Sequence, residues 1–120
     1  MALDSLYLIS QPTLSDGRFS ADISFDPGHE IFMGHFPEQS VVPGVVLIRI
    51  VKDTISRISG RKVKLQKAGN VKFLNIIDPE KTQNVSLSGT MQHDGTGNTT
   101  VSASIFLGET TFFRFKGIFS

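Results

Sequence analysis

The sequence predicts an α+β fold in which one long helix is covered by a curled antiparallel sheet. One segment in the middle of the chain has apolar residues at helical spacing. Several segments before and after it alternate apolar and polar residues, as strands with one buried face do. Glycine and proline stand singly between these segments, where turns are expected, and no internal repeat is present. Because there is only one helix, a sheet curled around it is the simplest way to bury the apolar side of the helix and the apolar face of the sheet.

The length and composition fit one domain. The chain has 120 residues, 39% of them hydrophobic, which is enough for one modest core. We therefore expect residues 1–120 to form a single domain. The sequence shows no secretory leader and no apolar run near the ~20 residues of a membrane helix, so we expect a soluble protein. Cysteine is absent, which fits a reducing compartment, and the cytoplasm is the expected location.

Charge and aromatic content narrow the classes of partner. Twelve basic and eleven acidic residues leave a net charge of +1, and no Lys/Arg cluster is dense enough for a phosphate backbone. Nucleic acid is therefore not an expected partner.

The chain has ten Phe, one Tyr and no Trp. Because Phe has no polar group, these rings should fill a core or line an apolar channel, and for most of them we expect the core.

The N-terminal part predicts a β-hairpin followed by a long loop. Residues 6–10 and 18–25 have the composition of strands, and the polar stretch between them contains the turn dipeptide Asp16-Gly17. A Pro-Gly pair then ends the second strand, and an irregular stretch runs on as far as Pro43. A loop of this length in a small domain is often functional.

Residues 45–58 predict one amphipathic helix. Its apolar residues recur at helical spacing and its polar residues share the other side. The apolar set is Leu47, Ile50, Val51, Thr54 or Ile55, and Ile58, and the polar set is Arg49, Lys52, Asp53, Ser56 and Arg57. Val, Ile and Thr favour strands, but Pro43 before the segment and Gly60 after it are typical helix boundaries. We expect this helix to be largely buried.

Three or four antiparallel strands should follow the helix, in residues 62–77, 83–92, 99–107 and 111–119. Apolar and polar residues alternate in the second and third of these segments, as they do in strands with one buried face. Gly108 and the polar run 94–97 supply turns between strands.

The candidate functional residues lie in and after the long loop. His35 is in the loop, and Gly44 stands where the helix should begin. Backbone N–H groups in the first turn of a helix have no partner within it, so the amide of Gly44 or its neighbours could polarise a carbonyl oxygen. An imidazole titrates near neutrality and can act as general base or acid. The alternative is a histidine that only bonds a backbone carbonyl, and spacing alone favours that alternative.

The residues of this segment resemble a known family. Gly34-His35-Phe36-Pro37, followed by Val-Val-Pro-Gly-Val-Val-Leu at 41–47, is similar to the signature of the 3-hydroxyacyl-(acyl-carrier-protein) dehydratases, which have a hot-dog fold. Residues 67–79 are similar to that family's strand after the central helix. The resemblance implies a homodimer with two apolar tunnels at its interface. It also implies an acyl chain that enters on the phosphopantetheine arm of an acyl carrier protein or CoA.

The resemblance also implies roles for single residues. In that family the histidine takes a proton from C2 of the substrate, the amide of the glycine in the Pro-Gly pair holds the thioester carbonyl, and an acidic residue assists loss of the 3-hydroxyl. The first two roles fall on His35 and Gly44. The remaining residues assigned to substrate binding are Phe36, Pro43, Val45 and Arg49. No cofactor is implied, and three dispersed histidines give no metal spacing, so we expect neither cofactor nor metal.

The acidic residue of the family has no counterpart at its usual position. The family carries Glu or Asp fourteen residues after the histidine, on the helix of the other subunit, and here that position is Arg49. A guanidinium has no acceptor and stays charged, so it cannot protonate a leaving hydroxyl. Asp53 stands one turn further on, where the family usually has Gln. Either Asp53 has become the catalytic acid or it forms an ion pair with Arg49. One turn is ~5.4 Å, more than catalytic positioning usually permits, which favours the ion pair.

Four other residues are weaker candidates. Glu38 could be an alternative carboxylate, and His29 with Glu30 could line the entrance of a tunnel. His93 lies beside a Gly-rich turn. For each of these we favour the interpretation of a solvated surface residue.

Three functions therefore remain open. The first is dehydration of a 3-hydroxyacyl thioester to the 2-enoyl thioester by His35 and Gly44. The second is a module that binds an acyl thioester or a carrier protein but has lost its catalytic acid. The third is thioester hydrolysis, which hot-dog relatives also perform. Similar dehydratases serve fatty acid biosynthesis or the assembly of polyene pigments, and the sequence does not choose between these pathways.

Overall fold

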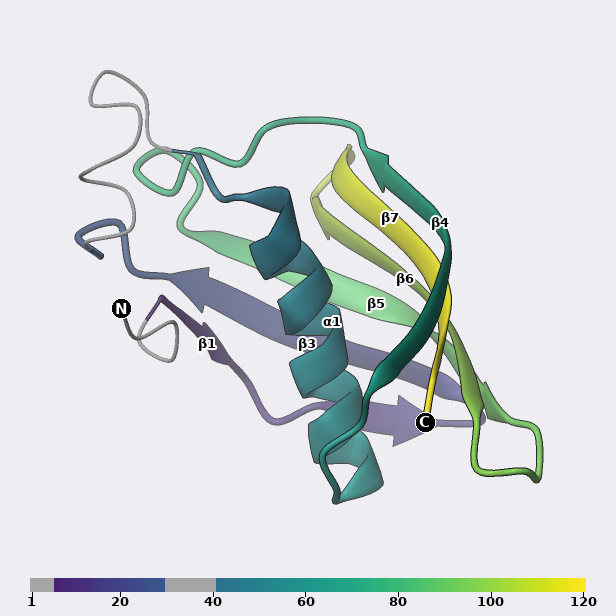
Figure 1. Ribbon diagram of the computed structural model, residues 1–120. Helices are drawn as coiled ribbons and strands as arrows, with labels where there is room; N and C mark the ends of the chain where they lie inside the picture. The colour runs from purple at the N-terminus through teal and green to yellow at the C-terminus, as the bar shows by residue number, and fades with distance from the viewer. Residues whose placement is uncertain (1–5, 30–40) are drawn as a thin grey trace.

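The computed structural model describes residues 6–29 and 41–120. One helix, α1 (Gly44–Ser59), lies across the inner face of an antiparallel sheet that bends around it (Figure 1). The strands are β1 (Tyr7–Ile9), β2 (Thr13–Ser15), β3 (Arg18–Phe25), β4 (Leu65–Phe73), β5 (Asn84–His93), β6 (Thr99–Leu107) and β7 (Thr110–Phe119). This arrangement confirms the predicted α+β class and the hot-dog fold.

The sheet order is β1-β3-β5-β6-β7-β4, with β2 pairing with β3 beside β1. All the pairs are antiparallel. The chain passes through α1 between β3 and β4, which places β4 at the far edge of the sheet from β1. The helix therefore lies between the two edges of a sheet that does not close.

The helix has the boundaries that its flanking residues predict. Pro43 precedes it in an extended conformation, and Gly60 ends it in the left-handed conformation at φ 71°. The buried residues of α1 are Val46, Leu47, Ile50, Val51, Thr54 and Ile55. The Thr54 hydroxyl donates a hydrogen bond of 2.8 Å to the Ile50 carbonyl, so this polar group is buried with a partner. Tertiary burial thus overrides the strand preference of the β-branched residues.

The aromatic rings of β7 form one side of the core. Phe113, Phe115 and Phe119 all point inward and are almost fully buried. Neighbouring rings along this row are 6.4 and 5.7 Å apart between centroids, which is within the range of favourable aromatic pairs. The expectation that most Phe rings fill the core is correct for these residues.

Gly89 lets two strands and a ring approach closely. A Cβ built on it would lie 2.1 Å from the Ser102 carbonyl oxygen and 2.8 Å from the Phe19 ring. Only glycine fits there without moving backbone.

The predicted hairpin is present, but with different partners. Asp16 and Gly17 form its turn, both with positive φ (52° and 76°), and they join β3 to β2 rather than to the first predicted strand. The strand predicted at 6–10 is β1, which pairs with the second half of β3. β2 was not predicted because its three residues are too few to show an alternating pattern.

Two further predictions need correction. The strand predicted at 62–77 is shorter, since β4 ends at Phe73 and the amides of Leu74 and Asn75 both turn to the Phe112 carbonyl. His29, predicted to be on the surface, is buried and its amide bonds the Asp26 carbonyl. The turn after β3 folds this histidine inward. His93 is exposed as predicted, and its ring bonds the Thr99 hydroxyl at 2.8 Å.

Candidate active site

A backbone hydrogen bond fixes the chain just before α1. The Val42 amide donates to the Ile77 carbonyl at 2.9 Å, which ties the approach to the helix to the segment after β4. Gly44 is the first residue of the helix, so its amide has no acceptor one turn earlier in the same helix. The amide carries part of the positive end of the helix dipole. This is the geometry in which a backbone N–H can polarise an oxygen.

Gly44 lies directly under an aromatic ring. A Cβ at this position would come within 2.7 Å of the Phe73 ring, so the absence of a side chain lets the ring pack on the helix start. Phe73 nevertheless remains 57% exposed, and Val45, the next residue of the helix, is 69% exposed. Two more exposed apolar residues, Leu74 and Ile76, follow Phe73 in the segment that is bonded to Val42. We call Val45, Phe73, Leu74 and Ile76 the apolar rim.

The structure places part of the predicted site. Pro43, Gly44 and Val45 meet at the helix start as expected. His35, Phe36 and Glu38 lie outside the described residues. Their assignments therefore stay predictions, as does the catalytic role of Asp53.

Arg49 and Asp53 form the ion pair that helical spacing allows. The Arg49 Nε lies 3.6 Å from Oδ2 of Asp53, and both side chains are partly exposed. A partly exposed pair of this kind contributes little to stability, typically ~0.3–0.5 kcal/mol. Its importance is that it brings the guanidinium and the carboxylate together on one side of α1.

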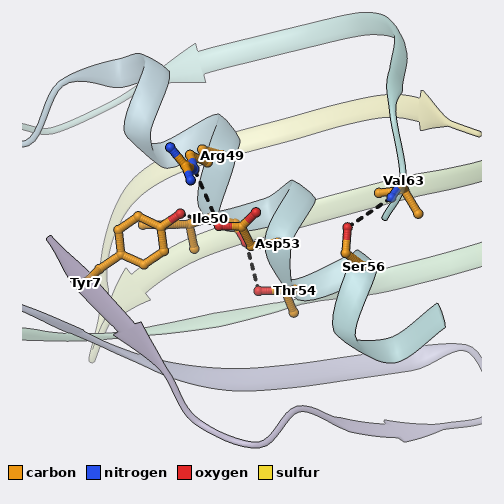
Figure 2. A network of polar contacts seen from close by, with 7 residues as sticks. All are labelled: Tyr7, Arg49, Ile50, Asp53, Thr54, Ser56 and Val63. Carbon is orange, nitrogen blue, oxygen red and sulfur yellow. Dashed lines mark hydrogen bonds and ion pairs between the residues drawn. The ribbon is translucent and has the colours of Figure 1, made fainter. Parts of the chain in front are cut away.

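A third residue, Tyr7 of β1, completes this group. Its hydroxyl donates a hydrogen bond to the same oxygen of Asp53, and Figure 2 shows the ring of Tyr7 approaching α1 beside Arg49 and Asp53. Burial of the ring raises the pKa of Tyr7 well above its ordinary value, and the hydrogen bond and the negative charge of Asp53 raise the pKa further. Arg49 acts in the opposite direction, with a smaller effect. Tyr7 is therefore a stable hydrogen-bond donor at neutral pH.

The three residues together restrict what Asp53 can do. Its Oδ2 accepts the hydrogen bond of Tyr7 and pairs with Arg49, so this oxygen is already engaged in the observed arrangement. A hollow of about 350 Å³ lies beside Asp53, and four of its six lining residues are basic: Lys52, Arg57, Arg61 and Lys62. A basic hollow does not suit an acyl chain. The geometry favours a structural ion pair over a relocated catalytic acid.

Sequence reasoning did not find Tyr7. It is separated from Asp53 by 46 positions, and no local pattern links a short N-terminal strand to the middle of the helix. Its one available signal was composition, since it is the single Tyr among eleven aromatic residues. A Tyr in place of Phe in a core is usually kept because its hydroxyl has a partner.

Residues 11–104 match the model of the ApeI-like family, which is described as ApeI dehydratase. The match covers more than three quarters of the chain. The chain belongs to the ApeI-like dehydratase family. The resemblance to hot-dog dehydratases, inferred from the residues around His35, is thereby confirmed. A search of curated proteins found no match.

Solved structures similar to this ApeI-like chain share its fold. The dehydratase heterocomplex ApeI:P from Xenorhabdus doucetiae matches with a TM-score of 0.71 and 18% identity, over 93% of this chain and 96% of that one. A candidate thioesterase, yhdA from Lactococcus lactis, matches with a TM-score of 0.69 and 14% identity, over 98% and 94%. An uncharacterised protein from Erwinia carotovora subsp. atroseptica matches with a TM-score of 0.60 and 23% identity, over 94% and 90%.

These matches span nearly the whole of both chains, so the ApeI-like chain has the size of its structural relatives. The relatives include both a dehydratase and a candidate thioesterase, and the fold alone does not choose between the two reactions. No helix in the described part of the chain is long and apolar enough to cross a bilayer.

Proposed function

We propose that this protein takes part in the dehydration of 3-hydroxyacyl thioesters to 2-enoyl thioesters. The observation that carries the proposal is the match to the ApeI-like dehydratase family across residues 11–104. It is supported by the position of Gly44 at the start of α1, nine residues after His35 in the sequence. The reaction needs a base at C2 of the substrate and a donor at the thioester oxygen, and these two residues supply both.

The proposed chemistry follows from these two groups. His35 takes the proton from C2, and the negative charge that develops passes to the thioester oxygen. The Gly44 amide donates to that oxygen and stabilises the charge, as oxyanion-hole donors do. The electron pair then forms the C2–C3 double bond while the C3–O bond breaks. The hydroxyl leaves as water, which requires one proton from an acid.

We propose that this acid comes from a second subunit of different sequence. Arg49 occupies the family's acidic position, and the Asp53 carboxylate is held by Tyr7 and Arg49. Two copies of this chain would then both lack the acid. The relative ApeI:P is a dehydratase heterocomplex, which gives a precedent for a dehydratase assembled from two different chains. The cytoplasm is the proposed location of this complex.

The edge strand β4 supports a dimer interface. Its outer side has no partner strand within the described chain, and every residue of β4 except Val71 is exposed. The apolar rim lies at one end of β4, beside the Gly44 amide. An exposed edge next to exposed apolar side chains is usually covered in a native assembly. We propose a homodimer for the chain alone and an active heterodimer through the same edge.

A carrier-bound substrate fits the charge of this region. Residues 49–72 contain eight basic residues and only one acidic residue, Asp53, although the net charge of the chain is +1. These residues form most of α1 and β4. An excess of positive charge in these two elements attracts the phosphodiester of a phosphopantetheine arm. We therefore propose an acyl carrier protein, or the related CoA thioester, as the source of the substrate.

The proposal is tested by presenting a 3-hydroxyacyl carrier-protein thioester to the purified chain, with and without a second hot-dog chain that carries a carboxylate at the family's acidic position. Enoyl thioester, free thiol and simple binding are measured separately. We expect enoyl product with the partner, abolished by His35→Ala and little affected by Asp53→Asn. Full activity of His35→Ala would overturn the assignment of the base.

A second function is supported by the contacts of the Asp53 carboxylate with Tyr7 and Arg49. If the chain has no acid of its own and no unlike partner, it would bind acyl thioesters without turning them over. Binding with neither enoyl product nor free thiol, in every combination of chains, would establish this alternative. Release of free thiol would instead establish thioester hydrolysis.

A further inference from the structure

The outer face of the sheet, which is turned away from α1, carries a hollow of about 430 Å³ over β4, β5, β6 and β7. Side chains alternate along each strand, and the polar side chains that line the hollow are the outward-facing ones. They include three cations, Lys72, Arg114 and Lys116, and three serines, Ser88, Ser102 and Ser104. The hollow therefore lies on the opposite face of the sheet from the Gly44 amide.

The strand register brings these groups into two adjacent rows. In one row, Ser88 pairs with Ser104, Ser104 with Arg114, and Arg114 with Lys72. In the next row, Ser102 pairs with Lys116. Partners directly opposite each other on neighbouring strands are ~5 Å apart at Cβ, so the hydroxyls and the cations face one shared space.

The positive charges in this space are not compensated by the described part of the chain. No carboxylate lines the hollow among the residues described, and none of the three cations forms a salt bridge there. Arg114 and Lys72 are directly opposite each other in the register. Like charges in this position destabilise a sheet. An arrangement that costs stability is explained if an anion occupies the space between the cations.

The side chains that line the hollow indicate which kind of anion it would bind. Serine hydroxyls leave the floor of the hollow open and can donate hydrogen bonds. A guanidinium binds phosphate oxygens in a bidentate manner, and lysine adds a point charge. Three cations match a ligand with two or more negative charges better than a single carboxylate. A second copy of this face would bring further positive charge and is disfavoured.

We propose that this hollow is a binding site for the phosphoryl groups of a small soluble diphosphate ligand. The site lies apart from the proposed catalytic groups, since it shares no residue with the helix start or with the apolar rim, and only one of its three cations, Lys72, belongs to the basic stretch 49–72. Its positive groups come from the two strands β4 and β7, and its hydroxyls come from β5 and β6.

The test uses inorganic pyrophosphate as the probe and the full chain as the protein. Pyrophosphate is titrated into the isotopically labelled protein at constant ionic strength, and amide NMR shifts and calorimetric heats are recorded. We expect saturable binding, with shifts centred on Ser88, Ser104, Arg114 and Lys116. Arg114→Gln should weaken the affinity about tenfold, because a charge-assisted bidentate contact is lost.

Two variants separate a specific site from general attraction of anions. Lys81→Gln removes the same charge from an exposed turn outside the hollow and should leave the affinity unchanged. Lys72→Glu should abolish binding while the thermal midpoint stays equal or rises, because it replaces a repulsive pair with an attractive one. Shifts spread over all basic surfaces, or equal loss of affinity in Lys81→Gln and Arg114→Gln, would overturn the proposal.

Discussion

Tyr7, Arg49 and Asp53 form one group of contacting residues around Arg49, which stands at the family's acidic position. A carboxylate at the Arg49 position would stand beside Asp53 on the same side of α1, and the two would repel each other. With Arg49 present, Asp53 gains a counter-ion, and Tyr7 from β1 donates to the same carboxylate oxygen. The buried hydroxyl therefore has a partner, and β1 is tied to the helix.

The single tyrosine makes this contact directly measurable. Burial and Asp53 raise the pKa of Tyr7, so the folded protein should show no tyrosinate absorbance at about pH 10, where a free tyrosine is half ionised. Because the pKa is raised on folding, the stability gained from Tyr7 is present below about pH 10. It is lost as the pH rises from there towards the folded pKa.

The measurement is an absorbance titration of the native and the denatured protein, with circular dichroism to verify folding. Asp53→Asn should lower the pKa of Tyr7 in the native protein only in part, since burial is the largest cause of its shift. Tyr7→Phe should remove the loss of stability that begins above about pH 10. A folded protein whose Tyr7 ionises near pH 10 would contradict the observed contact.

Single residues could be predicted from sequence only where a local motif marks them. Gly44 was recognised because it follows a proline at a helix start, and the structure places it there. The ion pair of Arg49 and Asp53 follows from helical spacing. Tyr7 could not be predicted, because its contact depends on how β1 packs against a helix that comes much later in the chain.

Gly89 lies where two neighbouring strands pack too tightly for a side chain. A Cβ on Gly89 would meet the Ser102 carbonyl oxygen and the Ala103 Cα, both of them backbone atoms that cannot move independently. We expect Gly89→Ala to lower the free energy of unfolding by about 3 kcal/mol, at the upper end of the range for overpacked sites. Denaturant unfolding followed by circular dichroism measures this change.

Gly69 is the matched control for that substitution. It also lies in a strand, but a Cβ there would make only an ordinary contact of 3.5 Å with the Lys116 carbonyl oxygen. Gly69→Ala should change the stability by less than about 1 kcal/mol. Equal losses in the two variants would show that the close crossing at Gly89 is not what limits the sheet.

Among the elements, those with long periodic patterns were predictable. The helix, expected at 45–58, spans Gly44–Ser59, and the strand expected at 99–107 is β6. The end of β4 could not be predicted, because Leu74 and Ile76 continue an apolar pattern although the chain has left the sheet. That apolar pattern reflects exposed side chains at the apolar rim, not a buried face.

At the scale of the whole molecule, the β4 edge of the open sheet is the one that lies next to exposed apolar side chains. β4 and the apolar rim are exposed together, and the start of α1 lies beside them. In the proposed assembly this edge pairs with a second chain, which would cover the rim and complete the site.

The assembly can be tested with one apolar-to-acidic change in the rim. Ile76 is 65% exposed, so Ile76→Asp should leave the fold intact but weaken self-association at least about tenfold. Leu14→Asp changes an exposed leucine on β2 in the same way and should have no effect. Sedimentation over a range of concentrations measures both. Dimers that dissociate in Leu14→Asp but not in Ile76→Asp would place the interface at the opposite edge.

The proposal that the chain has the base but lacks the acid is tested by restoring the family's residues. The double variant Arg49→Glu/Asp53→Gln carries a carboxylate at the family's acidic position and Gln one turn later. With a 3-hydroxyacyl thioester and no partner chain, we predict that it forms enoyl product about 100-fold faster than the unmodified chain, a gain typical of a positioned acid. The contradicting result would be an unmodified chain that is already active alone and loses that activity in Asp53→Asn.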